Sequence, residues 1–192
     1  MEDSIYGAHR SAMEDVMNIM LGSIDELRAN ITEEFGNDPV EHCLGRIKSE
    51  ESMREKCRRQ EIPETTESAL EVIHDAIGIR VVCAFISDVY SVRDHLMSMD
   101  KVEVVQEKDY IKHAKPNGYR SLHMILKYDN KYYVEIQIRT ISMDTWAALE
   151  HHLKYKKEIK NEQLIIQELK RCADELASTD ISMQTIRDLI ME

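Results

Sequence analysis

The sequence has no apolar run that approaches the ~20 residues needed to cross a lipid bilayer. Its first ten residues, MEDSIYGAHR, lack the basic region followed by an apolar region that marks a secretory signal. It also contains no internal repeat, low-complexity region or flexible linker. We therefore expect a cytoplasmic protein that does not insert into a membrane.

Metal-binding and disulfide signals are also absent. No two of the four cysteines form a Cys-x-x-Cys pair: Cys43, Cys57, Cys83 and Cys172. In a reducing compartment such cysteines are expected to be small buried or surface residues. The neighbouring His151 and His152 would point about 100° apart on a helix, which favours a structural role over a shared metal.

Positive charge is scarce, because the formal net charge is −11. This balance disfavours broad binding to a nucleic acid backbone. The first forty residues hold nine acids and two bases, whereas residues 46–60 hold six bases and three acids. The basic segment indicates a local site for an anion such as a nucleotide phosphate. A solvated helix face of mixed charge explains its composition equally well.

Hydrophobic spacing and turn residues predict alternating helices and strands. Extended segments are predicted over residues 40–48, 76–85, 102–111, 121–128 and 131–140, the last two joined by a turn at Asp129–Asn130. Helices are predicted over residues 4–35, 50–60, 63–74, 87–99 and 142–157. Gly22 is a possible interruption of the first helix, and two more helices are expected between residues 160 and 191, the second starting near Ser178.

These elements predict one α/β domain over residues 1–192, with α+β character and a mixed sheet of about five strands flanked by helices. Its core is expected over residues 40–157, with helical extensions at both ends. The last part of the chain carries a narrow apolar seam at Ile165, Leu169, Cys172 and Leu176. The seam packs either on the chain's own core or on another copy, and we expect an oligomer contact.

The basic segment has the spacing of a phosphate clamp. If Ser49 caps the next helix, the helix amides face the same way as Arg46 and Lys48. Ser52 and Lys56 stand four residues apart, on one face of that helix. Together these groups could hold a polyphosphate.

The strand predicted over residues 131–140 has one polar face. Glu135, Gln137 and Arg139 alternate there with apolar residues. Asp75 stands just before the apolar strand 76–85, and Arg80 lies inside it. Two carboxylates on neighbouring strands are a common way to hold Mg²⁺, so Asp75 and Glu135 are candidate ligands. Taken alone, Arg80 is most simply a buried residue paired with an acid.

Five segments, taken together, resemble the synthetase domain of the RelA/SpoT-homologue family. They are RxKSxxSxxxK from Arg46, GIRVV (78–82), KPNGYRSLH (115–123), EIQIRT (135–140) and WAALEH (146–151). The resemblance spans residues 40–157, in the family's order and spacing. No segment resembles the family's hydrolase domain or its ribosome-associated regulatory regions. The chain is therefore similar to a stand-alone small alarmone synthetase with a nucleotidyltransferase-like fold.

The resemblance implies an activity and a catalytic pair. The family transfers the β,γ-pyrophosphate of ATP to the ribose 3′-hydroxyl of GDP or GTP, which makes ppGpp or pppGpp and releases AMP in the stringent response. It implies that Asp75 holds Mg²⁺, and that Glu135 supports the metal and activates the 3′-hydroxyl. Related small synthetases also imply a homotetramer formed through the terminal helices.

The resemblance further implies the substrate contacts. Four residues would clamp the ATP phosphates: Arg46, Lys48, Ser52 and Lys56. Arg46 and Arg80 could also sandwich the adenine, because guanidinium planes stack well on flat rings. Tyr119 would stack on guanine in a loop fixed by Pro116 and Gly118, and Asn117 of that loop would also belong to the GDP/GTP-binding residues. Three residues would contact the acceptor's 5′-phosphates: Lys112, Lys115 and His123. Gln137 and Arg139 would shape the floor of the cleft, and Trp146 is expected in the core.

Two other functions fit the same sequence. Some members of the family resemble toxins that pyrophosphorylate tRNA 3′ ends, and others act on adenine nucleotides. The net charge does not indicate RNA binding, although residues 46–59 could serve it locally. A non-catalytic nucleotide- or RNA-binding regulator is the remaining alternative, and the presence of Asp75 and Glu135 disfavours it.

Overall fold

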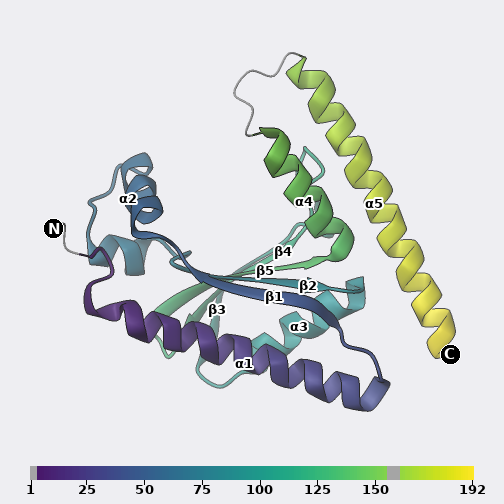
Figure 1. Ribbon diagram of the computed structural model, residues 1–192, viewed down its shortest axis with the longest axis horizontal. Helices are drawn as coiled ribbons and strands as arrows, with labels where there is room; N and C mark the ends of the chain where they lie inside the picture. Colours follow the sequence, from purple (N-terminus) through teal and green to yellow (C-terminus); the bar gives the residue numbers. More distant parts are fainter. Residues whose placement is uncertain (1–3, 155–160) are drawn as a thin grey trace.

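The computed structural model describes residues 4–154 and 161–192. Its centre is a sheet with the strand order β1-β2-β5-β4-β3 (Figure 1). The strands are β1 (Val40–Ile47), β2 (Ile77–Cys83), β3 (Val102–Asp109), β4 (Leu122–Tyr128) and β5 (Tyr132–Thr140). The β2–β5 pair is parallel and the other pairs are antiparallel. The predicted mixed five-stranded sheet is confirmed.

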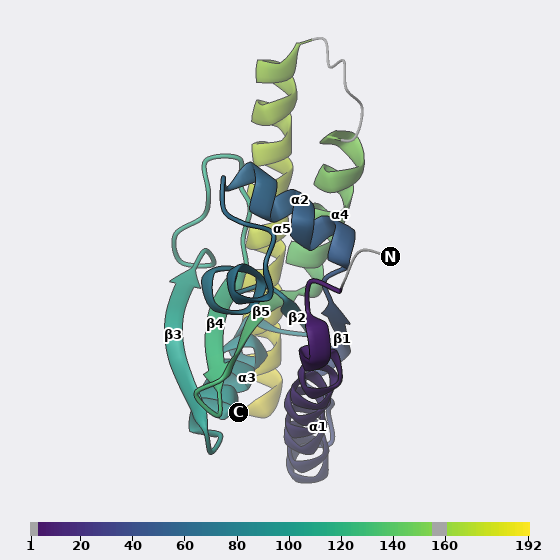
Figure 2. The same cartoon turned by 90° about the vertical axis from the view of Figure 1, so that its left-hand side faces the viewer.

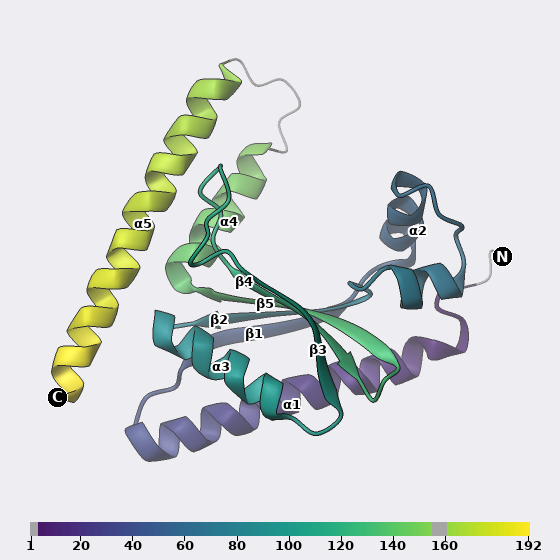
Figure 3. The same ribbon diagram turned by 180° about the vertical axis from the view of Figure 1, so that it is seen from behind.

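The helices leave part of one sheet face uncovered. They are α1 (Arg10–Phe35), α2 (Glu50–Arg59), α3 (Ile86–Ser98), α4 (Ile141–Lys154) and α5 (Glu162–Met191), with a 3₁₀ turn at Gly7–His9 and a π-helical segment at Ser68–Val72. Helices α1 and α3 cover one face, whereas α2 and α4 rise at opposite ends of the other face (Figures 1 and 3). Helix α5 runs beside α4, as Figure 2 shows from the side.

Side-chain alternation on β5 decides which face of the sheet is apolar. Val134, Ile136 and Ile138 are fully buried. They share the core with a stripe of α1 residues at helical spacing: Met13, Val16, Met20 and Ile24. The apolar face of the sheet is therefore the face that packs against α1 and α3. The polar residues of β5 must then point to the open face.

The β4–β5 hairpin matches the sequence prediction. Asp129 and Asn130 have φ values of 51° and 53°, the left-handed conformation that a two-residue type I′ turn requires at both positions. The other strands and the helices α2 and α3 lie within two residues of their predicted bounds. None of the described helices is both long enough and apolar enough to span a membrane.

The predictions for the first helix need two corrections. It begins at Arg10 instead of residue 4, and it passes through Gly22 without interruption. Buried side chains on both sides, Met20 and Ile24, hold it against the sheet. Their burial outweighs the ~1 kcal/mol that a glycine costs in a helix. The helix predicted over residues 63–74 is present but shorter: it spans residues 66–72 and is π-helical from Ser68 to Val72.

The prediction of two helices after residue 160 is wrong, because α5 is continuous. The polar residues expected to start a second helix bind elsewhere. The Thr179 hydroxyl donates to the Glu175 carbonyl, and the Asp180 carboxylate accepts from Thr140. The predicted apolar seam is also wrong at one position: Cys172 is exposed, and its neighbour Ala173 is buried in its place.

Helix α4 follows β5 almost directly. Its predicted end at residue 157 lies outside the described residues. Trp146 is buried as predicted and donates through Nε1 to the Leu169 carbonyl of α5 at 2.8 Å. Leu149 and Leu153, which share its apolar stripe in the sequence, are instead exposed. All four cysteines are free.

Candidate active site

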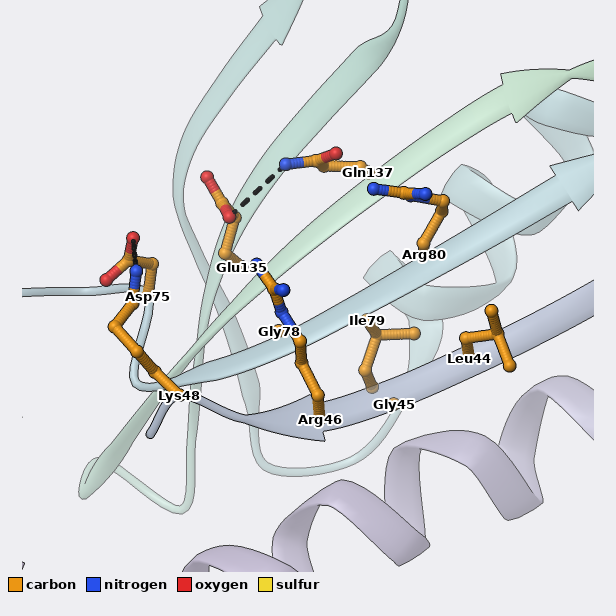
Figure 4. Close-up of a pocket in the computed structure, with 10 residues that line it drawn as sticks. All are labelled: Leu44, Gly45, Arg46, Lys48, Asp75, Gly78, Ile79, Arg80, Glu135 and Gln137. Carbon is orange, nitrogen blue, oxygen red and sulfur yellow. Dashed lines mark hydrogen bonds and ion pairs between the residues drawn. The ribbon is translucent and has the colours of Figure 1, made fainter. Parts of the chain in front are cut away.

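A cleft of about 190 Å³ lies on the open face of the sheet (Figure 4). It is lined by Leu44, Gly45, Arg46, Lys48, Asp75, Gly78, Ile79, Arg80, Glu135 and Gln137. Most of its polar residues were predicted as site residues, and they come from three separate chain segments. Two strand pairings join them: the antiparallel β1–β2 pairing sets Arg46 opposite Gly78, and the parallel β2–β5 pairing sets Gly78 opposite Glu135.

Asp75 is held by two lysines at one end of the cleft. Its Oδ2 lies 2.9 Å from Lys48 Nζ and 2.6 Å from Lys56 Nζ. Burial by itself raises the pKa of this carboxyl, but the hydrogen bonds and charges of the lysines outweigh burial and leave the pKa below its ordinary value. Asp75 is therefore a carboxylate at neutral pH. Its other oxygen, Oδ1, is buried and has no hydrogen-bond partner among residues 4–154 and 161–192.

That free oxygen suits a metal cation. Asp75 and Glu135 line the same cleft, and carboxylate oxygens are the protein ligands that Mg²⁺ prefers. Among the residues in the described ranges, no group of three or more His, Cys, Asp or Glu is gathered for a metal. Mg²⁺ in nucleotide sites commonly takes one or two carboxylates plus substrate phosphates. The donor set thus fits a metal that arrives with a nucleotide.

The N-terminus of α2 is capped as predicted. Ser49 accepts a hydrogen bond from the Ser52 backbone N–H at 3.3 Å, and its hydroxyl donates to Ser52 Oγ at 2.8 Å. Ser52 is not a lining residue of the cleft. The Tyr6 hydroxyl, from the segment before α1, donates to the Lys48 carbonyl at 2.7 Å. The backbone of Lys48, just after β1, is therefore fixed at both its carbonyl, by Tyr6, and its N–H, which donates to the Ala76 carbonyl.

The polar face of β5 is a connected row of side chains. Gln137 donates to Glu135 Oε2 at 3.4 Å (Figure 4), and Arg139 donates to Gln137 Oε1 at 2.8 Å. Arg80 lies beside this row. It is not a buried residue paired with an acid in the core: its side chain is 44% exposed, and its Nη1 lies 3.6 Å from Asp144. Arg80 is therefore accessible to a ligand in the cleft.

The loop before β4 presents a second group of predicted residues. The Tyr119 hydroxyl lies 2.7 Å from His123 Nε2. Lys115 Nζ lies 4.6 Å from the centre of the Tyr110 ring and 5.0 Å from that of Tyr119. Burial, with the nearby charges of Arg139 and two lysines, lowers the pKa of His123 to about 4. His123 is therefore neutral at neutral pH.

The same loop is held by Asn117 and Gly118. Asn117 Oδ1 accepts from the Tyr119 backbone N–H at 3.2 Å, and its Nδ2 donates to Glu150 of α4. Gly118 has a φ of 91°, which favours glycine. Lys112 is turned elsewhere, since its Nζ lies 3.4 Å from Asp109 and over the Tyr90 ring.

Sequence reasoning missed two residues at this site. Tyr110 packs edge-to-face against both Tyr119 and His123. Asp144 contacts both Arg80 and Arg139. The signals were present but weak: an aromatic residue close before a predicted substrate loop, and an acid in the first turn of the helix that follows Arg139.

Residues 45–160 match the family described as a region found in RelA / SpoT proteins, and the chain belongs to that family. It is 40% identical over 182 residues to the GTP pyrophosphokinase YwaC of Bacillus subtilis (strain 168), covering 86% of this chain and 87% of that protein.

Solved structures agree. The crystal structure of small alarmone synthetase 1 from Bacillus subtilis bound to its product pppGpp matches with a TM-score of 0.78 and 31% identity, over 96% of this chain and 95% of that one. Small alarmone synthetase 2 from Bacillus subtilis matches with a TM-score of 0.73 and 38% identity, over 90% and 96% of the two chains. The α+β fold predicted from the sequence is that of small alarmone synthetases.

Proposed function

We propose that the chain is a GTP pyrophosphokinase that transfers the β,γ-pyrophosphate of ATP to the ribose 3′-hydroxyl of GDP or GTP. The products are ppGpp or pppGpp, together with AMP. The observation that carries the proposal is the meeting of Asp75, Glu135 and several cations in one cleft. The match over nearly the full length of a GTP pyrophosphokinase supports it.

ATP occupies the cleft on the β1–β2 side in this proposal. Lys48 and Lys56 already surround one carboxylate oxygen of Asp75, so they can also attract phosphate oxygens. Arg46 and Arg80 line the same cleft and can flank the adenine. Ser52 adds its hydroxyl from the first turn of α2, close to the positive end of the helix.

Asp75 and Glu135 hold Mg²⁺ in this proposal, and the buried, unpartnered Asp75 Oδ1 supports this role. When bound, the ion supplies neutralising charge to the polyphosphate. Glu135 accepts the proton of the 3′-hydroxyl as the new bond from O3′ to the β-phosphorus forms. The bond between the β-phosphorus and the oxygen that bridges it to the α-phosphorus breaks, and AMP leaves with that oxygen.

The acceptor nucleotide lies toward the loop before β4. Guanine stacks on Tyr119, in the loop held by Asn117. Lys115 now lies over the Tyr119 ring, so stacking on that face requires it to turn toward the acceptor phosphates. Lys112 is exposed and can reach phosphates from the edge of the site. His123 is neutral, so it contacts phosphate as a hydrogen-bond donor and not as a cation.

The assembly of the protein is part of the proposal. Residues 1–192 act as a single synthetase domain, and copies associate into a homo-oligomer, a homotetramer by resemblance, through their terminal helices. Helix α5 packs on the core with one side and exposes apolar residues on the other: Leu164, Ile181, Ile186, Leu189 and Ile190. The nucleotides named above are cytoplasmic metabolites, so a cytoplasmic location is included.

The proposal is tested by the products formed with each acceptor. Purified protein is incubated with Mg²⁺ and ATP plus GDP, GTP, an adenine nucleotide or tRNA, and the products are separated by anion exchange. We expect a guanosine tetra- or pentaphosphate with GDP or GTP. Transfer only to tRNA or to adenine nucleotides would replace the proposed acceptor. The net charge of −11 argues against tRNA.

A variant separates catalysis from binding. Glu135→Gln keeps the shape of the side chain but removes the base, so turnover should fall by about 10²–10⁴-fold while ATP binding persists. Glu168→Gln, on the exposed side of α5, is the matched control and should keep full turnover. If the chain were a non-catalytic regulator, wild type and both variants would bind nucleotide, and none of the three would show turnover.

A further inference from the structure

Arg139 is a buried guanidinium whose three nitrogens are all engaged. Its side chain is 6% exposed, and its Nη1 lies 2.9 Å from Asp144 Oδ1. Its Nη2 donates to the Tyr119 hydroxyl at 2.7 Å and to Gln137 Oε1 at 2.8 Å. Its Nε donates to Ser121 Oγ at 3.4 Å. A guanidinium bound in this way has few alternative positions.

Two chains of contacts leave Arg139. One runs along β5 through Gln137, which donates to Glu135, the proposed base. The other runs to Tyr119, whose hydroxyl accepts from Arg139 and so has its own hydrogen available for His123 Nε2. The proposed base and the proposed guanine platform thus share one neighbour. A shift of Arg139 would move both.

Asp144 holds Arg139 in place. It lies in the first turn of α4, where the helix amides favour a negative charge. The same Oδ1 lies 3.6 Å from Arg80 Nη1, on the proposed ATP side. Asp144 therefore contacts cations that belong to both halves of the site. Without this charge the guanidinium of Arg139 would be buried without its carboxylate partner, which is costly.

We propose that Asp144 is a positioning residue for the pyrophosphate transfer. By fixing Arg139 it orients Glu135 through Gln137 and sets the Tyr119 ring, so that the 3′-hydroxyl of the acceptor meets its base. Asp144 itself lies outside the lining of the cleft and acts only through other side chains. This inference rests on the proposed function and assigns that site a further residue.

Asp144→Asn tests the inference because it removes the charge and keeps the shape. A small misplacement of the reacting groups slows a transfer reaction strongly, so we expect kcat/KM for GDP to fall by about 10²-fold. The fall should include both a higher KM for GDP, through Tyr119, and a lower kcat, through Glu135. Asp94→Asn, on the surface of α3, is the matched control with wild-type kinetics. Wild-type kinetics in Asp144→Asn would overturn the inference.

A double-mutant cycle separates positioning from general damage. Tyr119→Phe removes the hydroxyl that links the ring to Arg139. If Asp144 acts through that link, the double variant raises KM for GDP no more than Asp144→Asn alone. Independent, additive effects would contradict the inference. Asp144→Glu retains the charge with a different reach, so it should fold and give an intermediate KM even if Asp144→Asn is too unstable to measure.

A substrate-free readout distinguishes this inference from the proposed function. NMR signals of the His123 ring report on its contact with Tyr119, and they should shift in Asp144→Asn but not in Asp94→Asn. If wild-type protein makes no guanosine product, the proposed function fails, while the His123 signals still test the network. Unchanged His123 signals in Asp144→Asn would show that Asp144 does not hold the network of Arg139, Tyr119 and His123 in place.

Discussion

At the scale of single residues, the group proposed to bind the acceptor nucleotide contains a histidine that stays neutral, His123. Burial of His123, and the charges of Arg139 and Lys115 near it, make its protonation unfavourable in the folded protein. The neutral ring can accept a hydrogen bond from the Tyr119 hydroxyl at Nε2. A protonated ring could not accept there and could only donate to the Tyr119 oxygen, which already accepts from Arg139.

This arrangement predicts a pH dependence of stability. The pKa of His123 is about 4 in the folded protein and about 6.5 in the unfolded chain. Between these values the unfolded chain binds more protons, so stability is lost as the pH falls from ~6.5 to ~4, by up to about 3 kcal/mol.

Urea unfolding at several pH values measures this loss. His123→Gln should show a smaller loss across the window than wild type, because glutamine does not titrate. His42→Gln, at an exposed position of β1, should retain the wild-type dependence. Equal losses in wild type and His123→Gln would show that His123 does not cause the effect.

At the scale of elements, α5 is tied to α3 by a buried ion pair. Arg187 Nη1 lies 2.6 Å from the Asp88 carboxylate, whose side chain is 5% exposed. Arg187→Ala leaves this carboxylate buried without its cation, so the protein should lose about 3 kcal/mol of unfolding free energy. Denaturant titration measures the change. Arg171→Ala, which removes only solvent-exposed ion pairs, should leave the denaturation midpoint unchanged.

Helix α5 also packs closely against the loop before β4, where we propose that the acceptor nucleotide binds. A Cβ at Gly118 would lie 2.5 Å from the Cβ of Ala173, and the φ of 91° is strained for any other residue. Gly118→Ala should therefore displace Tyr119 and raise KM for GDP, while KM for ATP stays within about twofold. Steady-state kinetics with each substrate varied in turn measures both.

A second glycine provides the control for that substitution. Within the described part of the chain, a Cβ at Gly22 of α1 would meet no atom within 4 Å beyond its own stretch of helix backbone. Gly22→Ala should therefore preserve the kinetics and add up to about 1 kcal/mol of stability, because alanine favours the helix. A rise in KM for GDP in Gly22→Ala as well as Gly118→Ala would argue against a specific contact between loop and helix.

Local signals in the sequence predicted the sheet and the polar face of β5. The alternation around Glu135 and the Asp129–Asn130 turn depend on neighbouring residues alone. Tertiary contacts decided the rest. Asp180 reads as a helix start, but its carboxylate binds Thr140 of β5. The role of Asp144 depends on where α4 leaves the sheet, which no local pattern in the sequence predicts.

At the scale of the whole molecule, the exposed apolar side of α5 predicts association. Ile186 and Ile190 stand one helical turn apart, and their side chains are 49% and 76% exposed. Light scattering at micromolar concentrations should give a mass well above the 22.4 kDa of one chain. Ile186→Asp with Ile190→Asp should lower that mass, whereas Glu168→Gln should not. A wild-type mass of one chain throughout would rule the oligomer out.

The central claim is transfer of an intact pyrophosphate group, and isotopic labelling tests it most directly. Wild-type protein is incubated with Mg²⁺, GDP and ATP that carries ³²P at the β-position. The account predicts that the label appears in a guanosine tetraphosphate while unlabelled AMP forms in equal amount. Label that remains in ADP, or that is released as inorganic pyrophosphate without a labelled guanosine product, would contradict it.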